Sequence, residues 1–279
     1  MKSSYINLAC GSVFLENSNW INLDYVSSSK SVQKTNLLQR LPLEQETAEL
    51  VYSSHFLEHI PYSKVNDFLK ETLRILKPDG VLRVVLPDLE EMASNYVSLR
   101  GQGDHKKANF LVLEMIDQCV RNKRGGELGL FYQKIKKNKD RNKDMIEFIR
   151  ERTGEDLTKL PSPKINSYNH FSKKIEYILF AIARRIERYW IRIVLLALPA
   201  TFRAQNISLA GNGECHHWVW DFYSLKELLE TVGFINVKRV SAKSSAIKDF
   251  PFFPLDVDNK GQPRKGLESM YIEAIKPKI

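Results

Sequence analysis

A short polar turn, HFLEHIP at 55–61, places two histidines and a carboxylate within five positions of one another. His55, Glu58 and His59 could do three kinds of work. They could be hydrogen-bonded caps that hold the turn, with Glu58 complementing the start of the next helix. One of them could be a general base for a substrate proton. Two imidazoles and a carboxylate are also a plausible set of metal ligands. We favour the structural role over the base and the base over the metal, and we predict no bound metal.

A second histidine pair, His216 and His217, lies in a segment rich in Trp, Phe and Tyr. Such a pair is usually structural, so the residues alone assign it no role. Cys215 beside the pair suggests zinc, but a second Cys-x-x-Cys pair is absent from the sequence, and zinc is not predicted. Asp221 could orient a histidine or cap a helix.

The elements that position the first turn read as strand, helix and strand. Residues 48–53 have the β-branched and aromatic character of a strand, and a helix is predicted from Ser63. Pro78-Asp79-Gly80 should stop that helix, and 81–86 is an apolar run typical of a strand buried on both faces. This unit implies a right-handed parallel crossover, and open α/β sheets bind ligands at the carboxyl ends of their strands.

The same kind of pattern continues on both sides of this unit. A capping box is predicted at Ser224 and Glu227, with Gly233 ending the helix. The connections after the first two strands are too short for full helices. Residues 89–172 read as helices and polar loops. The other predicted strands are 5–9, 20–23, 33–38, 234–240 and 270–275.

Charge is concentrated in one part of the chain. The 279 residues carry a net charge of +9, but residues 96–204 carry +11 and the remainder carries −2. The basicity therefore points to a separate functional surface. Three widely spaced cysteines indicate a reduced, intracellular protein, and the N-terminus lacks the apolar core of a signal peptide. We expect a cytoplasmic protein.

The stretch 175–203 is the most basic helical candidate, with Arg184, Arg188 and Arg192 at helical spacing. It could pack on the domain with a solvated basic face. It could also lie at an anionic membrane surface, with its apolar side in lipid, which would place the protein peripherally at the inner face of the membrane. Its arginines interrupt the apolar run well short of the ~20 residues needed to span a bilayer. Basic charge alone does not separate lipid or glycan from nucleic acid, which we do not favour.

Taken together, these segments resemble the class I S-adenosylmethionine-dependent methyltransferases of the methyltransferase type 11 kind. The resemblance is carried by INLACG (6–11), NLD (22–24), NLLQRLPL (36–43), HFLEHIP (55–61), LKETLRILKPDGVLRVVLPD (69–88) and SLKELLETVGFINVKRV (224–240). GECHHWVWDFYSL (213–225) and RKGLESMYIEAIKP (264–277) resemble a bacterial subgroup found among cell-surface glycan genes.

The resemblance implies a Rossmann-like α/β fold, with a mostly parallel seven-stranded sheet and an antiparallel last strand. It implies a methyltransferase domain at 1–95 and 205–279 with a basic helical insertion at 96–204. S-adenosylmethionine is the implied cofactor. Gly11 would form the tight turn beside its amino acid half, Asp24 would accept both ribose hydroxyls, and Asn36 would accept from the adenine amino group. The full set of implied cofactor-binding residues is Ala9, Cys10, Gly11, Asp24, Tyr25, Asn36, Leu37, Ser53 and His55.

The implied reaction is methyl transfer, with O-methylation of a small-molecule or glycan-linked acceptor as the favoured chemistry. The implied catalytic residues are His216, His59 and Glu58, with either histidine as the base. The single glycine of ACGS (9–12) and the short link to Trp20 depart from the usual cofactor motif. They motivate an alternative, a catalytically silent module that binds a membrane surface or an envelope-assembly partner. No oligomeric state is predicted.

Overall fold

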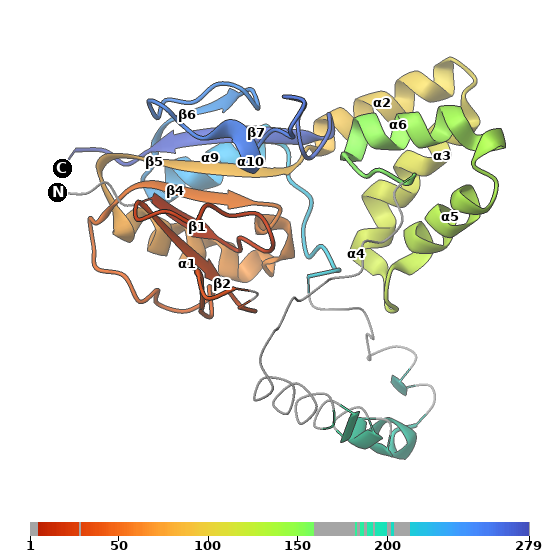
Figure 1. Ribbon diagram of the computed structural model, residues 1–279, viewed down its shortest axis with the longest axis horizontal. Helices are drawn as coiled ribbons and strands as arrows, with labels where there is room; N and C mark the ends of the chain where they lie inside the picture. Colours follow the sequence, from red (N-terminus) through yellow and green to blue (C-terminus); the bar gives the residue numbers. More distant parts are fainter. Residues whose placement is uncertain are drawn as a thin grey trace.

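The computed structural model describes residues 5–27, 29–158, 182, 185–186, 189–191, 193–199, 202–203 and 213–278. A seven-stranded sheet forms its centre, with the strand order β3-β2-β1-β4-β5-β7-β6 (Figure 1). The strands are β1 (Tyr5–Leu8), β2 (Trp20–Asp24), β3 (Val32–Lys34), β4 (Ala48–Ser54), β5 (Leu76–Pro87), β6 (Ile235–Val240) and β7 (Ser269–Ile275). β1 to β5 pair in parallel, and β7 runs antiparallel between β5 and β6. This is the predicted sheet, so the predicted fold class is confirmed.

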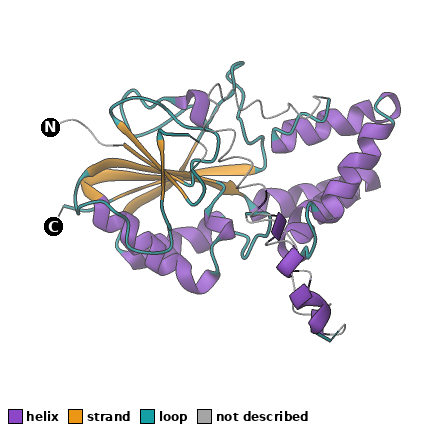
Figure 2. Cartoon of the chain, turned by 60° about the horizontal axis from the view of Figure 1, so that its bottom comes forward, coloured by secondary structure: helices purple, strands orange, loops and turns teal. Residues whose placement is uncertain are grey.

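The two faces of the sheet are covered differently. The helices α1 (Tyr62–Ile75) and α9 (Phe222–Val232) pack on one face, against alternate strand residues such as Leu8 and Val51 (Figure 2). Residues of opposite parity, Leu50 and Tyr52 among them, pack on the other face against the 242–257 segment with its short α10 (Phe252–Leu255). Period-two alternation of this kind places successive side chains on opposite faces. No helix follows β1 or β2 within the described residues before β4, as the short connections predict.

Two helix ends differ from the sequence prediction. α1 ends at Ile75, and the chain is extended from Leu76. The residue before a proline, here Lys77, disfavours helical backbone, so the helix does not continue to Pro78. α9 begins at Phe222 and not at Ser224: its cap is Asp221, whose side chain accepts a hydrogen bond from the backbone N–H of Ser224 at 2.8 Å. The capping box was therefore wrong, and of the two roles considered for Asp221 the cap is correct.

A group of helices follows β5 and extends beyond the sheet (Figure 1). They are α2 (Leu89–Gly101), α3 (His105–Val112), the π-helical η2 (Leu113–Asp117), α4 (Gln118–Val120), α5 (Gly126–Lys137), the 3-10 turn η3 (Asp140–Asn142) and α6 (Lys143–Thr153). They enclose their own apolar cluster around Phe110 and Ile149. α2 runs through the predicted boundary at residue 95, and the division into domain and insertion stays a prediction.

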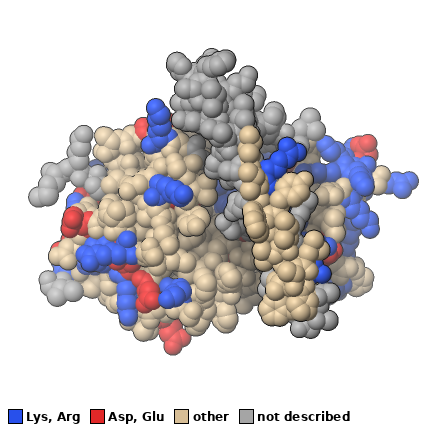
Figure 3. All heavy atoms as spheres, turned by 90° about the horizontal axis from the view of Figure 1, so that it is seen from below, with Lys and Arg blue, Asp and Glu red and all other residues tan. Residues whose placement is uncertain are grey.

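Lys and Arg side chains gather over the end of the molecule that these helices form (Figure 3). The last turn of α5 alone carries Lys134, Lys136 and Lys137. Arg184, Arg188 and Arg192 lie outside the described residues, so the membrane-surface prediction for 175–203 stays a prediction. Among the helices that are described, none has the length and apolar content needed to cross a membrane.

Candidate active site

The turn after β1 and the end of β2 meet as the sequence predicts. The backbone N–H of Gly11 donates to Oδ2 of Asp24 at 2.8 Å, and that of Val26 donates to Oδ1 at 2.9 Å. Ala9 and Gly11 have φ of 55° and 56°, and no atom lies within 4 Å of where a Gly11 Cβ would be. A carboxylate offers about four lone-pair sites, so after these two bonds Asp24 can still accept from two ribose hydroxyls. The turn leaves open space beside that carboxylate, and these residues fit the cofactor.

The other predicted cofactor-binding residues differ in their exposure and in their hydrogen bonds. Oδ1 of Asn36 accepts from the backbone N–H of Leu38 at 3.1 Å, which fixes the amide beside the end of β3. Leu37 is buried in the main core, whereas Tyr25 is 58% exposed. Burial and the nearby Asp24 raise the pKa of the Cys10 thiol to about 12, so the Cys10 thiol stays protonated at neutral pH. Their cofactor roles stay predictions.

The sheet register connects the cofactor turn to the histidine turn. Leu8 pairs with Leu23 on one side and with Ser53 on the other, so Ala9, Asp24 and the end of β4 share one edge. Ser53 is buried and its Oγ has no hydrogen-bond partner among the described residues. The carboxyl edge of the sheet thus carries polar groups on β2 and β4, and such sheets bind ligands at this edge.

Past β4 the chain turns sharply and brings His55, Glu58, His59 and His216 together. His55 has φ of 52°, and its ring reaches Ser269 Oγ at 2.9 Å through Nε2 and Glu58 Oε1 at 3.3 Å through Nδ1. The turn η1 (Leu57–His59) follows, and Nδ1 of His59 contacts the carbonyl oxygen of Cys215 at 2.8 Å. The ring of His216 packs edge-on against that of His59, with centroids 4.8 Å apart. Two residues from η1, one residue that precedes it and one from a distant loop therefore form one cluster.

Backbone bonds hold the distant loop in place. The backbone N–H of His217 donates to the carbonyl oxygen of Glu58 at 2.7 Å, and that of His216 donates to the carbonyl oxygen of Gln118 at 2.9 Å. His216 is 8% exposed, while His217 faces solvent. The two adjacent histidines are thereby distinguished: His216 belongs to the cluster and His217 does not.

The pKa values of His55, Glu58 and His216 set the charges in the cluster. Burial lowers the pKa of His55 to about 4, and burial also lowers that of His216 to about 4. Burial alone would raise the pKa of Glu58, but His55 and the other nearby histidines outweigh it and lower the pKa to about 2. At neutral pH the cluster holds an ionised Glu58 beside the neutral imidazoles of His55 and His216.

A cavity of about 290 Å³ opens beside this cluster, between the sheet edge and the helices that follow β5. His55 and His216 line it, together with Glu114 of η2 and with Lys265 and Glu268, which precede β7. Burial raises the pKa of Glu268 well above its usual value, helped by the charge of Glu114. Burial also lowers the pKa of Lys265. The sequence analysis missed Glu114, Lys265 and Glu268, because no motif or spacing singles them out.

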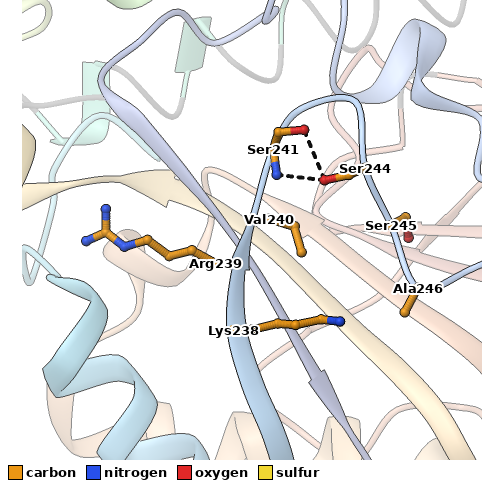
Figure 4. A pocket seen from close by; sticks show the side chains of 7 residues that line it. All are labelled: Lys238, Arg239, Val240, Ser241, Ser244, Ser245 and Ala246. Atoms are coloured by element: carbon orange, nitrogen blue, oxygen red, sulfur yellow. Dashed lines mark hydrogen bonds between the residues drawn. The ribbon is translucent and has the colours of Figure 1, made fainter.

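A larger hollow, about 480 Å³, lies along the edge strand β6 (Figure 4). Its side chains include Lys238 and Arg239, and its two central serines bond to each other, Ser241 Oγ to Ser244 Oγ at 3.0 Å. No imidazole, carboxylate or thiol lines it. The larger hollow therefore offers fewer groups that could act as acid, base or ligand than the smaller cavity does. We take the smaller cavity as the candidate active site.

Comparison with known proteins gives a family match for part of the chain. Residues 20–84 match the family model of a methyltransferase domain. No curated protein matches the sequence. Among solved structures, an S-adenosylmethionine-dependent methyltransferase from Mesorhizobium loti is 18% identical, over 31% of this chain and 47% of its own, with a TM-score of 0.27. The match thus spans about half of that protein.

Two further structures are similar to the chain. A SAM-dependent methyltransferase from Archaeoglobus fulgidus is 13% identical over 98% of this chain and 86% of its own, with a TM-score of 0.42. Phosphoethanolamine N-methyltransferase 1 from Haemonchus contortus, solved with phosphoethanolamine and S-adenosylhomocysteine, is 13% identical over 33% of this chain and 23% of its own, with a TM-score of 0.28.

The strand order and the family match together define the class of protein. The chain has the fold of the class I S-adenosylmethionine-dependent methyltransferases and carries their domain sequence over 20–84. The family match over 20–84 supports the methyltransferase class predicted from the sequence, and binding of S-adenosylmethionine stays a proposal. The bacterial glycan subgroup is not confirmed, and the silent-module alternative gains no support.

Proposed function

We propose that the protein transfers the methyl group of S-adenosylmethionine to a hydroxyl of a small-molecule or glycan-related acceptor bound in the 290 Å³ cavity. The observation that carries the proposal is the shared sheet edge. The cofactor turn at Gly11 and Asp24 lies at one end of it, and the cavity begins at His55, directly after β4. Donor and acceptor bound at these two places meet beside the end of β4.

Methyl transfer to a hydroxyl needs little covalent help from the protein. The oxygen's electron pair forms the new C–O bond, the C–S bonding pair returns to sulfur, and the hydroxyl proton leaves. Holding donor and acceptor in line supplies much of the acceleration. We assign removal of the proton to the cluster of Glu58, His59 and His216, because His216 lines the cavity and contacts His59.

The lining of the cavity favours a polar acceptor with several hydroxyls. Glu114 is 4% exposed and its Oε1 has no hydrogen-bond partner among the described residues, so it can accept from a hydroxyl. Tyr132 and Thr153 line the same cavity and add hydroxyl groups of their own. An apolar acceptor would leave Oε1 of Glu114 unpaired, which costs about 1–3 kcal/mol.

Two measurements test the proposal. Calorimetry with S-adenosylmethionine should show binding to the wild type that is lost in Asp24→Ala. Methyl-labelled cofactor, supplied with a panel of nucleotide sugars and free oligosaccharides, should then yield an O-methylated product by mass spectrometry. No binding at millimolar cofactor would refute the enzyme, and a product methylated only on nitrogen would refute the hydroxyl acceptor. Location in the cytoplasm and attachment to a membrane through 175–203 stay part of the proposal, tested by sedimentation with anionic liposomes.

A further inference from the structure

Glu58 is a buried carboxylate whose two oxygens lack hydrogen-bond donors. Its side chain is 1% exposed, and neither Oε1 nor Oε2 has a hydrogen-bond partner among the described residues. The contact of Oε1 with His55 Nδ1, at 3.3 Å, is within ion-pair distance but is not a directed hydrogen bond. An ionised carboxylate in this condition is costly unless a positive charge compensates it. The ring nitrogens Nδ1 of His55 and Nε2 of His59 lie 3.3 Å and 3.9 Å from Oε1 of Glu58.

The geometry of the neighbours is that of ligands around a cation. One oxygen of Glu58 and one ring nitrogen each from His59 and His216 lie within 4.8 Å of one another. Nδ1 of His59 donates to the carbonyl oxygen of Cys215 at 2.8 Å, so its proton is on Nδ1 and Nε2 keeps its lone pair. That nitrogen lies 3.9 Å from Glu58 Oε1. Metal-binding histidines commonly donate their other N–H to a backbone carbonyl in this way, which fixes tautomer and ring orientation.

We propose that Glu58, His59 and His216 bind a divalent transition-metal ion, with Zn²⁺ as the best match. Two imidazole nitrogens and one carboxylate oxygen are a set that Zn²⁺ binds in catalytic sites, where a fourth position stays open. His216 lines the cavity, so the open position faces the acceptor. His55 stays outside the ligand set and contacts both Glu58 and Ser269.

The cation also gives the cluster a definite role in the proposed reaction, and this part of the inference rests on the proposed function. A bound Zn²⁺ lowers the pKa of a coordinated hydroxyl and stabilises the developing oxyanion. With the ion bound, Glu58, His59 and His216 are ligands and none of them is a free base, so the proton of the coordinated hydroxyl would pass to a water molecule in the cavity and not to the cluster. Binding of the ion itself depends only on the three side chains and holds for any acceptor.

The test uses the full-length chain without an affinity tag, stripped of metal with a chelator and dialysed. Titration with Zn²⁺ by calorimetry, and with Co²⁺ by visible absorption, should show one ion per chain. His216→Ala and His59→Ala should each weaken binding by at least tenfold. His217→Ala is the matched control, since it removes the adjacent exposed histidine, and it should bind as the wild type does.

Folding is checked separately, because Glu58 is buried. Glu58→Gln keeps the size of the side chain, and circular dichroism with a urea titration shows whether it remains folded. A folded Glu58→Gln with weakened Zn²⁺ binding supports the site. Wild type that binds no Zn²⁺, or folded variants that all bind it equally, would overturn the inference. The same stripped protein is titrated with S-adenosylmethionine: loss of that binding counts against the proposed function and leaves the metal site standing.

Discussion

Replacing Asp24 with asparagine tests the cofactor site in the least disruptive way. Both carboxylate oxygens of Asp24 accept a backbone N–H, one from Gly11 and one from Val26. Asparagine has a single acceptor oxygen, and its NH₂ must face one of these two N–H groups, donor against donor. The variant therefore loses one bond within the turn and one acceptor for a ribose hydroxyl, along with the negative charge.

The expected loss follows from the bonds that remain. A hydrogen bond to a charged group contributes about 1.5–3 kcal/mol, so loss of one ribose contact should weaken S-adenosylmethionine binding roughly ten- to hundredfold. Calorimetry measures the change in Kd. Asp79→Asn is the matched control, because it removes the same charge from an exposed position near the start of β5, at the opposite edge of the sheet, where Asp79 pairs with Lys278 at 2.8 Å. If Asp24→Asn binds within twofold of wild type while Asp79→Asn does too, Asp24 does not hold the ribose.

The remaining predictions concern stability. Arg83→Met should cost about 3–5 kcal/mol in urea unfolding, because Arg83 is fully buried with ion pairs of 2.8 Å to Asp256 and Glu273. Burial raises the pKa of Asp256 and the charge of Arg83 lowers it, so without Arg83 that pKa rises further and the variant should lose more stability as pH rises; an equal loss at low and high pH contradicts this. Burial raises the pKa of Glu268, so stability present at low pH is lost as pH rises through that value, and Glu268→Gln should flatten the pH dependence of Tm. Gly266→Ala should unfold the chain, since φ is +69° and a Cβ would overlap the carbonyl of Arg152; a Tm within a few degrees of wild type would refute it.

Local patterns predicted the sheet correctly, and with it they brought together the residues of the proposed cofactor turn. Gly11 and Asp24 lie thirteen positions apart, yet both follow short strands that pair side by side, so strand assignment alone brings them together. His55, Glu58 and His59 are close in sequence, and any turn after β4 keeps them close. For such residues, correct strand assignment is almost enough to predict which of them lie close together.

The acceptor side could not be found in this way. Glu114 and Glu268 meet at one cavity although 154 positions separate them, and the contact depends on how the helices after β5 fold back toward β7. No periodic pattern in the sequence predicts how these helices fold back toward β7. Arg83 shows the same limit: a charge in the middle of an apolar strand is acceptable only because Asp256, far along the chain, lies 2.8 Å away.

The bond from the His216 N–H to the Gln118 carbonyl attaches the acceptor side of the site to the helices after β5. The acceptor side and the cofactor side are therefore held by different elements. This bond ties the cluster to the helices after β5, and the same helices supply Glu114 to the cavity. The cofactor turn is held by other bonds: the Gly11 N–H donates to Asp24 at the end of β2, and Asp24 also accepts from the Val26 N–H. Substitutions in these helices should therefore change which acceptor is methylated and leave cofactor affinity intact. Glu114→Gln, which keeps the size of the side chain and removes its charge, separates the two sides most directly.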